Sequence, residues 1–292
     1  MKTLEPGETP PFDHHGPRYL DASEVLIEGR PALFGLPYDG TTSFRPGTRG
    51  GPDALRAASV GLETYSPTQD RDFEQRPFAD LGNLDIPFGS PAPVVALAEQ
   101  TTAWILEAGS VPFMIGGEHS LTVGPVRAMA AKHPDLAVIQ IDAHADLRDG
   151  YLGEPLSHAA AMRRCLELLD GPEAMLQVGI RSGTREEFVE MREQGRLVSP
   201  DAASLQKALP RLGERPLYIT LDLDVFDPSC FPGTGTPEPG GIDWKTFSEL
   251  LSVIPWDRVV GLDAVELSPM LDASGCSNVL AAKAVREMLL AL

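Results

Sequence analysis

Cysteine is scarce in this sequence, and a long apolar run is absent from it. The three cysteines are far apart, odd in number and form no CxxC pair: Cys165, Cys230 and Cys276. This pattern argues against a disulfide framework and against a thiolate zinc site. No stretch approaches the ~18 to 20 consecutive apolar residues of a membrane span, and residues 1–16 contain no apolar segment typical of a secretory signal. We therefore expect a cytoplasmic protein with no membrane partner.

Positively charged residues are too few to balance the negatively charged ones. Lys and Arg number 24 against 42 Asp and Glu, which gives a formal net charge of -18. Nucleic acid binding depends on Lys and Arg that neutralise phosphates, so this balance disfavours a nucleic acid partner. It favours a small cationic ligand, although an acidic balance more often reflects solubility than substrate choice.

Length and composition are typical of one large unit. The chain has 292 residues, of which 42% are hydrophobic, and this is enough to bury a sizeable core. Residues 1–30 are rich in Pro, Gly and charge, and we expect them to form an irregular N-terminal arm. Residues 31–292 show no internal repeat, low-complexity tract or obvious linker, so we expect a single domain there.

Short apolar runs alternate with amphipathic stretches after this arm. The runs that predict strands are 32–36, 78–81, 111–115, 136–142, 175–180, 196–198, 217–222 and 259–265. The stretches that predict helices are 91–108, 121–132, 159–169, 185–194, 244–253 and 278–292. Strands alternating with helices indicate parallel pairing, and parallel strands are covered on both faces. We therefore predict an α/β fold, a three-layer α/β/α sandwich with a mostly parallel sheet of about eight strands.

Ligands of an open parallel sheet lie beyond the carboxyl ends of its strands, and three of the predicted strand ends carry unusual clusters of polar residues. The clusters are Glu118 and His119; Asp142, His144 and Asp146; and Asp222, Asp224 and Asp227. Residues two apart in an extended segment point the same way, so the members of each cluster can converge on one site.

These clusters contain the ligand types of an oxygen-rich metal site. The candidate ligands are His119, Asp142, His144, Asp146, Asp222 and Asp224. A lone Asp at a strand end is usually a helix cap, and a lone His is usually a hydrogen-bonded core residue. Four carboxylates and two imidazoles together exceed the needs of one ion and suit a pair that shares bridging carboxylates. The absence of thiolates favours Mn²⁺ ahead of Zn²⁺, and ligand type alone leaves Fe, Co and Ni open.

The same segments resemble the signature blocks of the ureohydrolase superfamily, which contains arginases, agmatinases and guanidino-acid relatives. The blocks are GGEHS at 116–120, DAHAD at 142–146, TLDLDVFDPSCFPGTGTPEPGG at 220–241, FGLPYDGTTSFRPGTRGGPDALR at 34–56 and LDAVELSP at 262–269. The resemblance runs from about Ala32 to the end and is strongest to agmatinases. This chain has Thr220 where the family often has Ser, and Ala159 where many members have Gly.

The resemblance implies a role for each candidate residue in a single ureohydrolase catalytic domain. One Mn²⁺ would be held by His119, Asp142, Asp146 and Asp222, and the other by Asp142, His144, Asp222 and Asp224. Asp227 is no family ligand, and next to Pro228 we expect it to fix a turn. Glu266 would pair with the guanidinium, Asp146 would also accept a hydrogen bond from a bridging hydroxide, and His158 would shuttle protons to the departing amine. The assembly would be a homotrimer or homohexamer.

The net charge of the expected metal site favours a guanidinium substrate. The segment before His158 indicates which guanidino compound to expect. Two divalent ions, four carboxylates and a hydroxide sum to a formal charge of about -1, which attracts a cation. Arginases resemble one another in an Asn after DAHxD and a Ser-Gly-Asn segment that grip the α-carboxylate, and this chain has neither. We therefore expect agmatine, whose terminal ammonium Asp149 or Glu154 would meet. Arg148 leaves guanidinobutyrate open.

Other functions remain as alternatives. Arginase and formiminoglutamase are further activities within the superfamily, and a deacetylase-like metallohydrolase would share the metals. The glutamate Glu266 and the loop at 232–241 count against a deacetylase. A regulator without catalytic activity ranks last, because all six ligand positions are filled.

Overall fold

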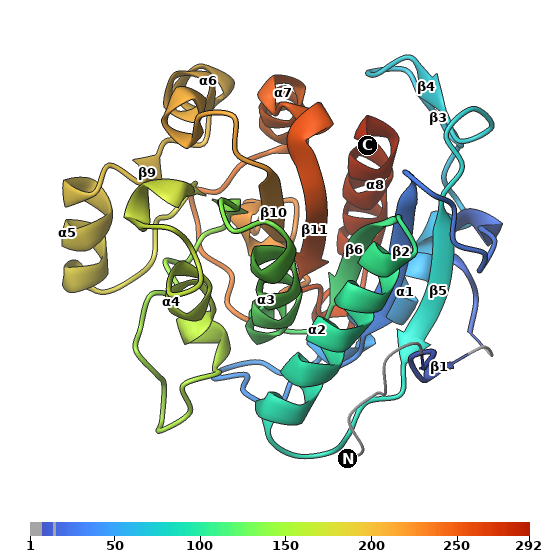
Figure 1. Ribbon diagram of the computed structural model, residues 1–292, viewed down its shortest axis with the longest axis horizontal. Coiled ribbons are helices and arrows are strands. Elements are labelled where there is room, and N and C mark those ends of the chain that lie inside the picture. The colour runs from blue at the N-terminus through green and yellow to red at the C-terminus, as the bar shows by residue number, and fades with distance from the viewer. Residues whose placement is uncertain (1–7, 14–15) are drawn as a thin grey trace.

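A nine-stranded sheet forms the centre of the protein in a computed structural model that describes residues 8–13 and 16–292. The strands follow the order β1-β5-β2-β6-β11-β10-β7-β8-β9 (Figure 1). Their bounds are β1 Phe12–Asp13, β2 Pro31–Leu36, β5 Ala79–Leu84, β6 Val111–Gly116, β7 Ala137–Ile141, β8 Met175–Val178, β9 Leu197–Val198, β10 Leu217–Asp222 and β11 Val259–Val265. Every pair is parallel except β1 with β5. A separate hairpin joins β3 Tyr65–Ser66 to β4 Arg71–Asp72.

All eight predicted apolar runs are strands of this sheet, and the predicted mostly parallel α/β fold is confirmed. The ninth strand, β1, comes from the N-terminal arm and was not expected. It adds an antiparallel edge next to β5, where Phe12 lies opposite Leu84. Most of the other strands are nearly continuous apolar runs because both of their faces are buried.

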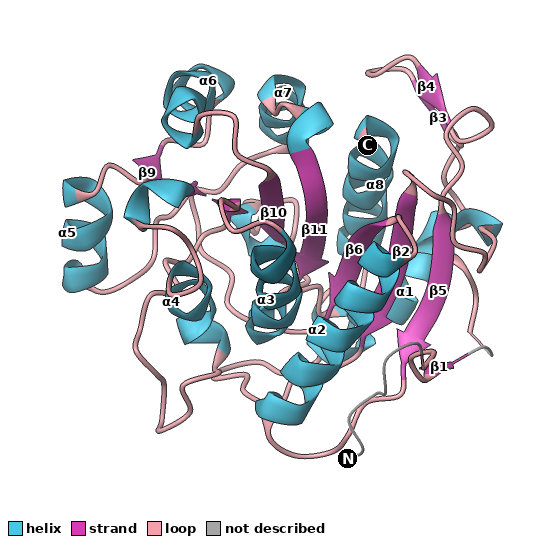
Figure 2. Cartoon of the chain, viewed as in Figure 1, coloured by secondary structure: helices cyan, strands magenta, loops and turns pink. Residues whose placement is uncertain are grey.

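Helices cover both faces of the sheet (Figure 2). One face carries α1 Gly51–Ser59, α6 Ala202–Ala208, α7 Trp244–Val253 and α8 Cys276–Ala291, and the other carries α2 Pro91–Glu107, α3 Val123–Lys132, α4 Ala161–Leu166 and α5 Arg185–Glu193. Neighbouring residues of one strand enter opposite cores: Leu33 packs with the α8 side, and Phe34 packs with the α2 side. Among the described residues, no helix is long and apolar enough to cross a membrane.

All six predicted helices are present, and two of them are clearly shorter than the predicted ranges. The expected helix at 121–132 begins as a 3-10 turn, His119–Thr122, before α3, and the one at 159–169 is reduced to α4 after a similar turn, His158–Ala160. Two helices were not predicted. Helix α1 begins with Gly51 and Pro52, and these two residue types are more common in turns than in helices. Helix α6 has only seven residues, and the Asp201 side chain caps its first turn.

The described part of the N-terminal arm is fastened to the domain by buried polar contacts. The Tyr19 hydroxyl donates to Ala282 O in α8 at 2.6 Å, and the Tyr19 N–H donates to Asp80 in β5 at 2.7 Å. Asp80 is fully buried and also accepts two hydrogen bonds from Arg56 of α1, at 2.7 and 2.8 Å. Residues 1–7 and 14–15 of the arm lie outside the described residues.

Candidate active site

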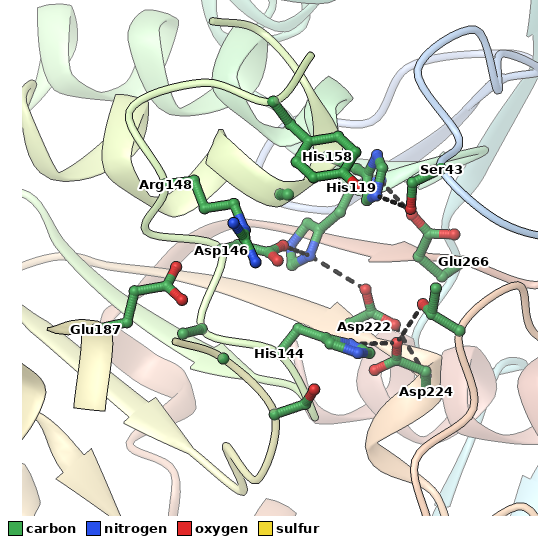
Figure 3. Close-up of a pocket in the computed structure, with 16 residues that line it drawn as sticks. Ser43, His119, His144, Asp146, Arg148, His158, Glu187, Asp222, Asp224 and Glu266 are labelled. Atoms are coloured by element: carbon green, nitrogen blue, oxygen red, sulfur yellow. Dashed lines mark hydrogen bonds and ion pairs between the residues drawn. The ribbon is translucent and has the colours of Figure 1, made fainter. Parts of the chain in front are cut away.

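The predicted site residues, which are the six ligands and Glu266, converge at the carboxyl ends of four neighbouring strands, and Figure 3 shows His119, His144, Asp146, Asp222, Asp224 and Glu266 around one pocket. His119 follows β6, the cluster from Asp142 to Asp146 follows β7, and Asp222 ends β10. Glu266 follows β11, which lies between β6 and β10. A cavity of about 260 Å³ is lined by His119, His144, Asp146, Asp222, Asp224 and Glu266, together with Ser43, Arg148, Tyr151, His158, Glu187 and Thr236. Asp142 is fully buried and is not one of the lining residues.

The first cluster surrounds one nitrogen of a buried imidazole. His119 Nδ1 lies 3.1 Å from a carboxylate oxygen of each of Asp142, Asp146 and Asp222. On the other side of the ring, Nε2 lies 2.8 Å from the Thr220 hydroxyl, which donates to Asp263 at 2.6 Å. A hydroxyl has one proton, so Thr220 accepts from Nε2–H, and the neutral ring presents the lone pair of Nδ1 to the three carboxylates.

This arrangement requires a positive charge. Burial by itself lowers the pKa of His119, but hydrogen bonds with Asp142, Asp146 and Asp222 raise it well above its usual range. Burial and Asp142 likewise raise the pKa of Asp146 to about 6. Four electron-rich atoms face one another without a proton when His119 is neutral, and a divalent cation satisfies all of them. The donor set therefore fits a metal ion.

A second cluster adjoins the first and shares Asp142 with it. The ligand atoms of Asp142, His144 and Asp224 lie within 4.8 Å of one another. His144 Nδ1 is 2.8 Å from Asp224 Oδ2 and 3.9 Å from Asp142 Oδ1. Burial lowers the pKa of His144, and Asp224 and Asp142 raise it to about 10. Asp222 contacts both clusters. Its Oδ2 lies 3.1 Å from His119 Nδ1 in the first cluster, and its Oδ1 accepts the backbone N–H of Asp224 in the second at 2.8 Å.

Two of the site carboxylates sit on strained backbone. Asp146 has φ 52° and Glu266 has φ 68°, in the left-handed region that residues other than glycine rarely adopt. Such strain persists where surrounding contacts enforce it, and it concentrates at functional sites. For Glu266 those contacts are its N–H to Gly117 O and its carboxylate to the His119 N–H, both at 2.8 Å. Burial and Glu118 raise the pKa of Glu266 well above its usual range.

His158 forms the wall of the cavity opposite Asp222 and Asp224 (Figure 3). Its Nδ1 lies 3.3 Å from the Thr41 hydroxyl, and its Nε2 lies 3.1 Å from the Ser43 hydroxyl. Burial lowers the pKa of His158 to about 4, although a hydrogen bond with the Thr41 backbone opposes this shift. The imidazole is therefore neutral around pH 7.

The structure does not bring Asp149 into the cavity, and it places Glu154 in an adjoining one. The Asp149 side chain is 98% exposed and pairs with Arg164 at 2.7 Å. Glu154 lines a neighbouring cavity of about 340 Å³, which shares Tyr151 with the first. Asp227 lies at a turn, where it accepts hydrogen bonds from the N–H groups of Ser229, Gly240 and Gly241.

Several polar residues of the site were missed by sequence reasoning. Asp263 and Tyr218 lie inside strands, and the motif blocks contain Thr41 and Ser43 without indicating what they contact. Glu118 was named at a strand end, but its contact with Thr41 was not predicted. The signal that was available is a polar residue inside an otherwise apolar strand. Asp263 is such a residue, and it is fully buried between the hydroxyls of Tyr218 and Thr220.

Known proteins resemble the chain over nearly its whole length. A family model described as the Arginase family matches residues 30–291. The agmatinase of Bacillus anthracis is 42% identical over 281 residues, covering 95% of this chain and 97% of that protein. The mitochondrial guanidino acid hydrolase of Homo sapiens is 38% identical over 279 residues, covering 91% of this chain and 79% of that protein.

Solved structures agree with this relationship. The agmatine ureohydrolase of Thermoplasma volcanium superimposes with a TM-score of 0.84 at 33% identity, covering 94% of this chain and 93% of its own. The resemblance of the sequence blocks to the ureohydrolase superfamily, and to agmatinases within it, is confirmed. The chain belongs to the arginase family.

Proposed function

We propose that this ureohydrolase is a binuclear manganese enzyme that hydrolyses the guanidinium of agmatine to putrescine and urea. The observation that carries the proposal is the pair of adjoining clusters that share Asp142, with His119 Nδ1 aimed at three carboxylate oxygens. Most of the donor atoms are carboxylate oxygens, and thiolates are absent from the cavity lining, which supports Mn²⁺.

Each ion would have four protein ligands. His119, Asp142, Asp146 and Asp222 would hold one Mn²⁺, and Asp142, His144, Asp222 and Asp224 would hold the other. The sharing of Asp142 between the two clusters supports its assignment as a bridge. When bound, the two ions supply Lewis acidity and lower the pKa of a shared water, so that a nucleophile is available at neutral pH.

The chain's own residues bind the substrate and move protons. The Glu266 carboxylate pairs with the guanidinium and orients its carbon toward the two clusters. Asp146 accepts a hydrogen bond from the attacking water. Water adds to the guanidinium carbon, the bond to the alkyl nitrogen breaks, and the products are urea and a protonated amine. His158 carries a proton between solvent and this departing nitrogen.

Agmatine is the favoured substrate because the surroundings of the cavity are acidic. The net charge is -18, and Glu154 lies in the adjoining cavity, where a terminal ammonium would find a carboxylate. Asp149 was the other expected partner of the ammonium, and we no longer assign it this role because it pairs with Arg164. The activity named for the Bacillus anthracis relative supports the same choice.

One observation favours a second candidate, an ω-guanidino acid such as guanidinobutyrate. Arg148 lines the catalytic cavity with its guanidinium over the Tyr151 ring, where it could meet a carboxylate. The activity named for the human relative is of this class. The two candidates differ only in the group at the far end of the substrate.

A substrate panel with the Mn²⁺-loaded protein distinguishes these activities. The panel contains agmatine, arginine, guanidinobutyrate and formiminoglutamate, and each product is measured under steady-state conditions. We expect the largest kcat/KM for agmatine. A larger value for arginine or guanidinobutyrate would refute the agmatine proposal and leave the ureohydrolase assignment intact. On the resemblance to the superfamily, we also propose a homotrimer or homohexamer, which analytical ultracentrifugation tests.

A further inference from the structure

A buried carboxylate contacts His158 through a single threonine. Glu118 is fully buried and accepts three hydrogen bonds: from the Thr41 N–H at 2.7 Å, from the Thr41 hydroxyl at 2.5 Å and from the Ser120 hydroxyl at 2.5 Å. The Thr41 hydroxyl oxygen also accepts a hydrogen bond from the backbone N–H of His158 at 3.0 Å, and it lies 3.3 Å from the ring nitrogen Nδ1 of His158. Thr41 therefore connects a carboxylate to the imidazole that lines the catalytic cavity.

The single proton of the Thr41 hydroxyl decides the direction of each contact. A carboxylate only accepts hydrogen bonds, so the Thr41 proton is committed to Glu118. The hydroxyl oxygen of Thr41 can then only accept hydrogen bonds, through its two lone pairs. One lone pair accepts the backbone N–H of His158. The contact with Nδ1 is attractive only if Nδ1 carries the proton. Nε2 is then the nitrogen with the lone pair, and it faces Ser43.

We infer that Glu118 and Thr41 are positioning residues that hold His158 in the tautomer with the proton on Nδ1 and the free lone pair on Nε2. The inference rests on the proposed shuttle role of His158 for its consequence in catalysis, but its structural content is independent of that role. Ser43, which contacts Nε2, lines the catalytic cavity. The nitrogen that takes up and releases protons is thus the one on the cavity side.

A matching arrangement on His119 supports this interpretation. There, the Asp263 carboxylate takes the proton of the Thr220 hydroxyl, so that Nε2 carries the ring proton and Nδ1 is free. Both histidines are held by a buried carboxylate through a threonine hydroxyl. The threonine contacts Nε2 in one case and Nδ1 in the other, and in each case the free nitrogen is the one on the side of the cavity or the carboxylate cluster.

The substitution Glu118→Gln is designed to reverse the tautomer without a change of shape. The backbone N–H of Thr41 needs an acceptor, so the amide oxygen of the Gln side chain should occupy the position of Glu118 Oε2. The amide NH₂ then occupies the position of Oε1 and faces the hydroxyls of Thr41 and Ser120. The NH₂ group then donates to the Thr41 oxygen and frees the Thr41 proton for His158 Nδ1. The NH₂ group keeps a hydrogen bond to both hydroxyls, and the ring proton moves to Nε2.

The tautomer is read directly from ¹⁵N chemical shifts of the histidine ring in protein labelled at histidine and loaded with diamagnetic Zn²⁺. The sequence contains six histidines, and His158→Ala identifies the signals of His158. We expect the Nδ1–H pattern in the native protein and in Thr41→Ser, and the Nε2–H pattern in Glu118→Gln. Thr42→Val is the matched control, since the buried Thr42 hydroxyl has no hydrogen-bond partner among the described residues, and it should keep the native pattern.

Turnover provides the second measurement. We expect kcat to fall about tenfold in Glu118→Gln and Thr41→Val, with the metal content of each chain and KM nearly unchanged. Thr41→Ser and Thr42→Val should remain within about twofold of the native rate. An Nδ1–H pattern in Glu118→Gln would overturn the inference. Native turnover in both Glu118→Gln and Thr41→Val, alongside a loss of turnover in His158→Ala, would refute the catalytic consequence of the tautomer. Native turnover in His158→Ala would instead refute the shuttle role, while the ¹⁵N result would still decide the tautomer.

Discussion

The Thr220 hydroxyl is the smallest group whose removal should weaken metal binding without touching a ligand. Thr220→Val replaces a hydroxyl by a methyl group of similar size, so the packing of β10 is kept. His119 Nε2–H then loses its acceptor at 2.8 Å, and Asp263 loses a donor at 2.6 Å. Both groups are buried, so water cannot replace the lost partner.

The magnitude follows from these two contacts. Loss of a hydrogen-bond partner that orients a metal-binding histidine typically lowers metal affinity about 10-fold to 100-fold. Asp263 keeps the hydrogen bond from the Tyr218 hydroxyl, so His119 Nε2–H is the group left unpaired. One unpaired buried polar group costs about 1–3 kcal/mol, and the free energy of unfolding of the metal-free protein should fall by a similar amount. Thr220→Ser keeps the hydroxyl and should retain most of the affinity and stability.

Two measurements test the prediction. Chelator competition gives the affinity for Mn²⁺, and urea unfolding of the metal-free protein gives the stability. Thr102→Val is the matched control, because Thr102 in α2 is fully buried and its hydroxyl has no partner among the described residues. The reasoning is refuted if Thr220→Val binds Mn²⁺ as tightly as Thr220→Ser does.

Three further predictions concern single residues. Asp224→Asn removes one anionic ligand from the second cluster, so elemental analysis should find fewer than the expected two Mn²⁺ per chain, with little change in the melting temperature; an unchanged metal content would contradict the assignment. His158→Ala should retain both ions and lose about a hundredfold to ten-thousandfold in turnover, part of which added imidazole should restore. Asp80→Asn leaves Arg56 without its buried partner and should lower the free energy of unfolding by about 3–5 kcal/mol in urea titrations, whereas a loss below about 1 kcal/mol would show that the pair contributes little.

The sheet was predictable because its signal is local. Most of the parallel strands are apolar runs of four to seven residues with both faces buried, whereas β5 also contains Asp80 and Asn83 and β9 has only two residues. The strand β1 was not predictable, since it consists of Phe12 and Asp13 and exists only through pairing with β5. Helix α1 was missed for a related reason: its first residues, Gly51 and Pro52, favour a turn, and packing against α8 stabilises the helix.

The candidate ligands could be named from the sequence because strand ends meet at one edge of a parallel sheet. The contacts of the hydroxyl groups could not be named. Thr41 and His158 are 117 residues apart, and Thr220 reaches Asp263 across 43 residues. Threonine is common, and its role here depends on where its one proton points, which only the packed structure determines.

The contacts between the N-terminal part of the chain and α8 join segments that are far apart in the sequence. Tyr19 donates its hydroxyl to Ala282 O across 263 residues, and Gln69 and Arg71 bind carbonyl oxygens in the last turns of the same helix. Contacts of such large separation form late, because the entropy of closing the loop must be overcome before they contribute. On the ribosome, the N-terminal segments are synthesised before α8 and cannot form these contacts until α8 has been made. The part of this face that α8 covers therefore stays exposed until α8 is made, although α1, α6 and α7 of the same face precede it in the chain, and exposed apolar surface of this kind favours aggregation.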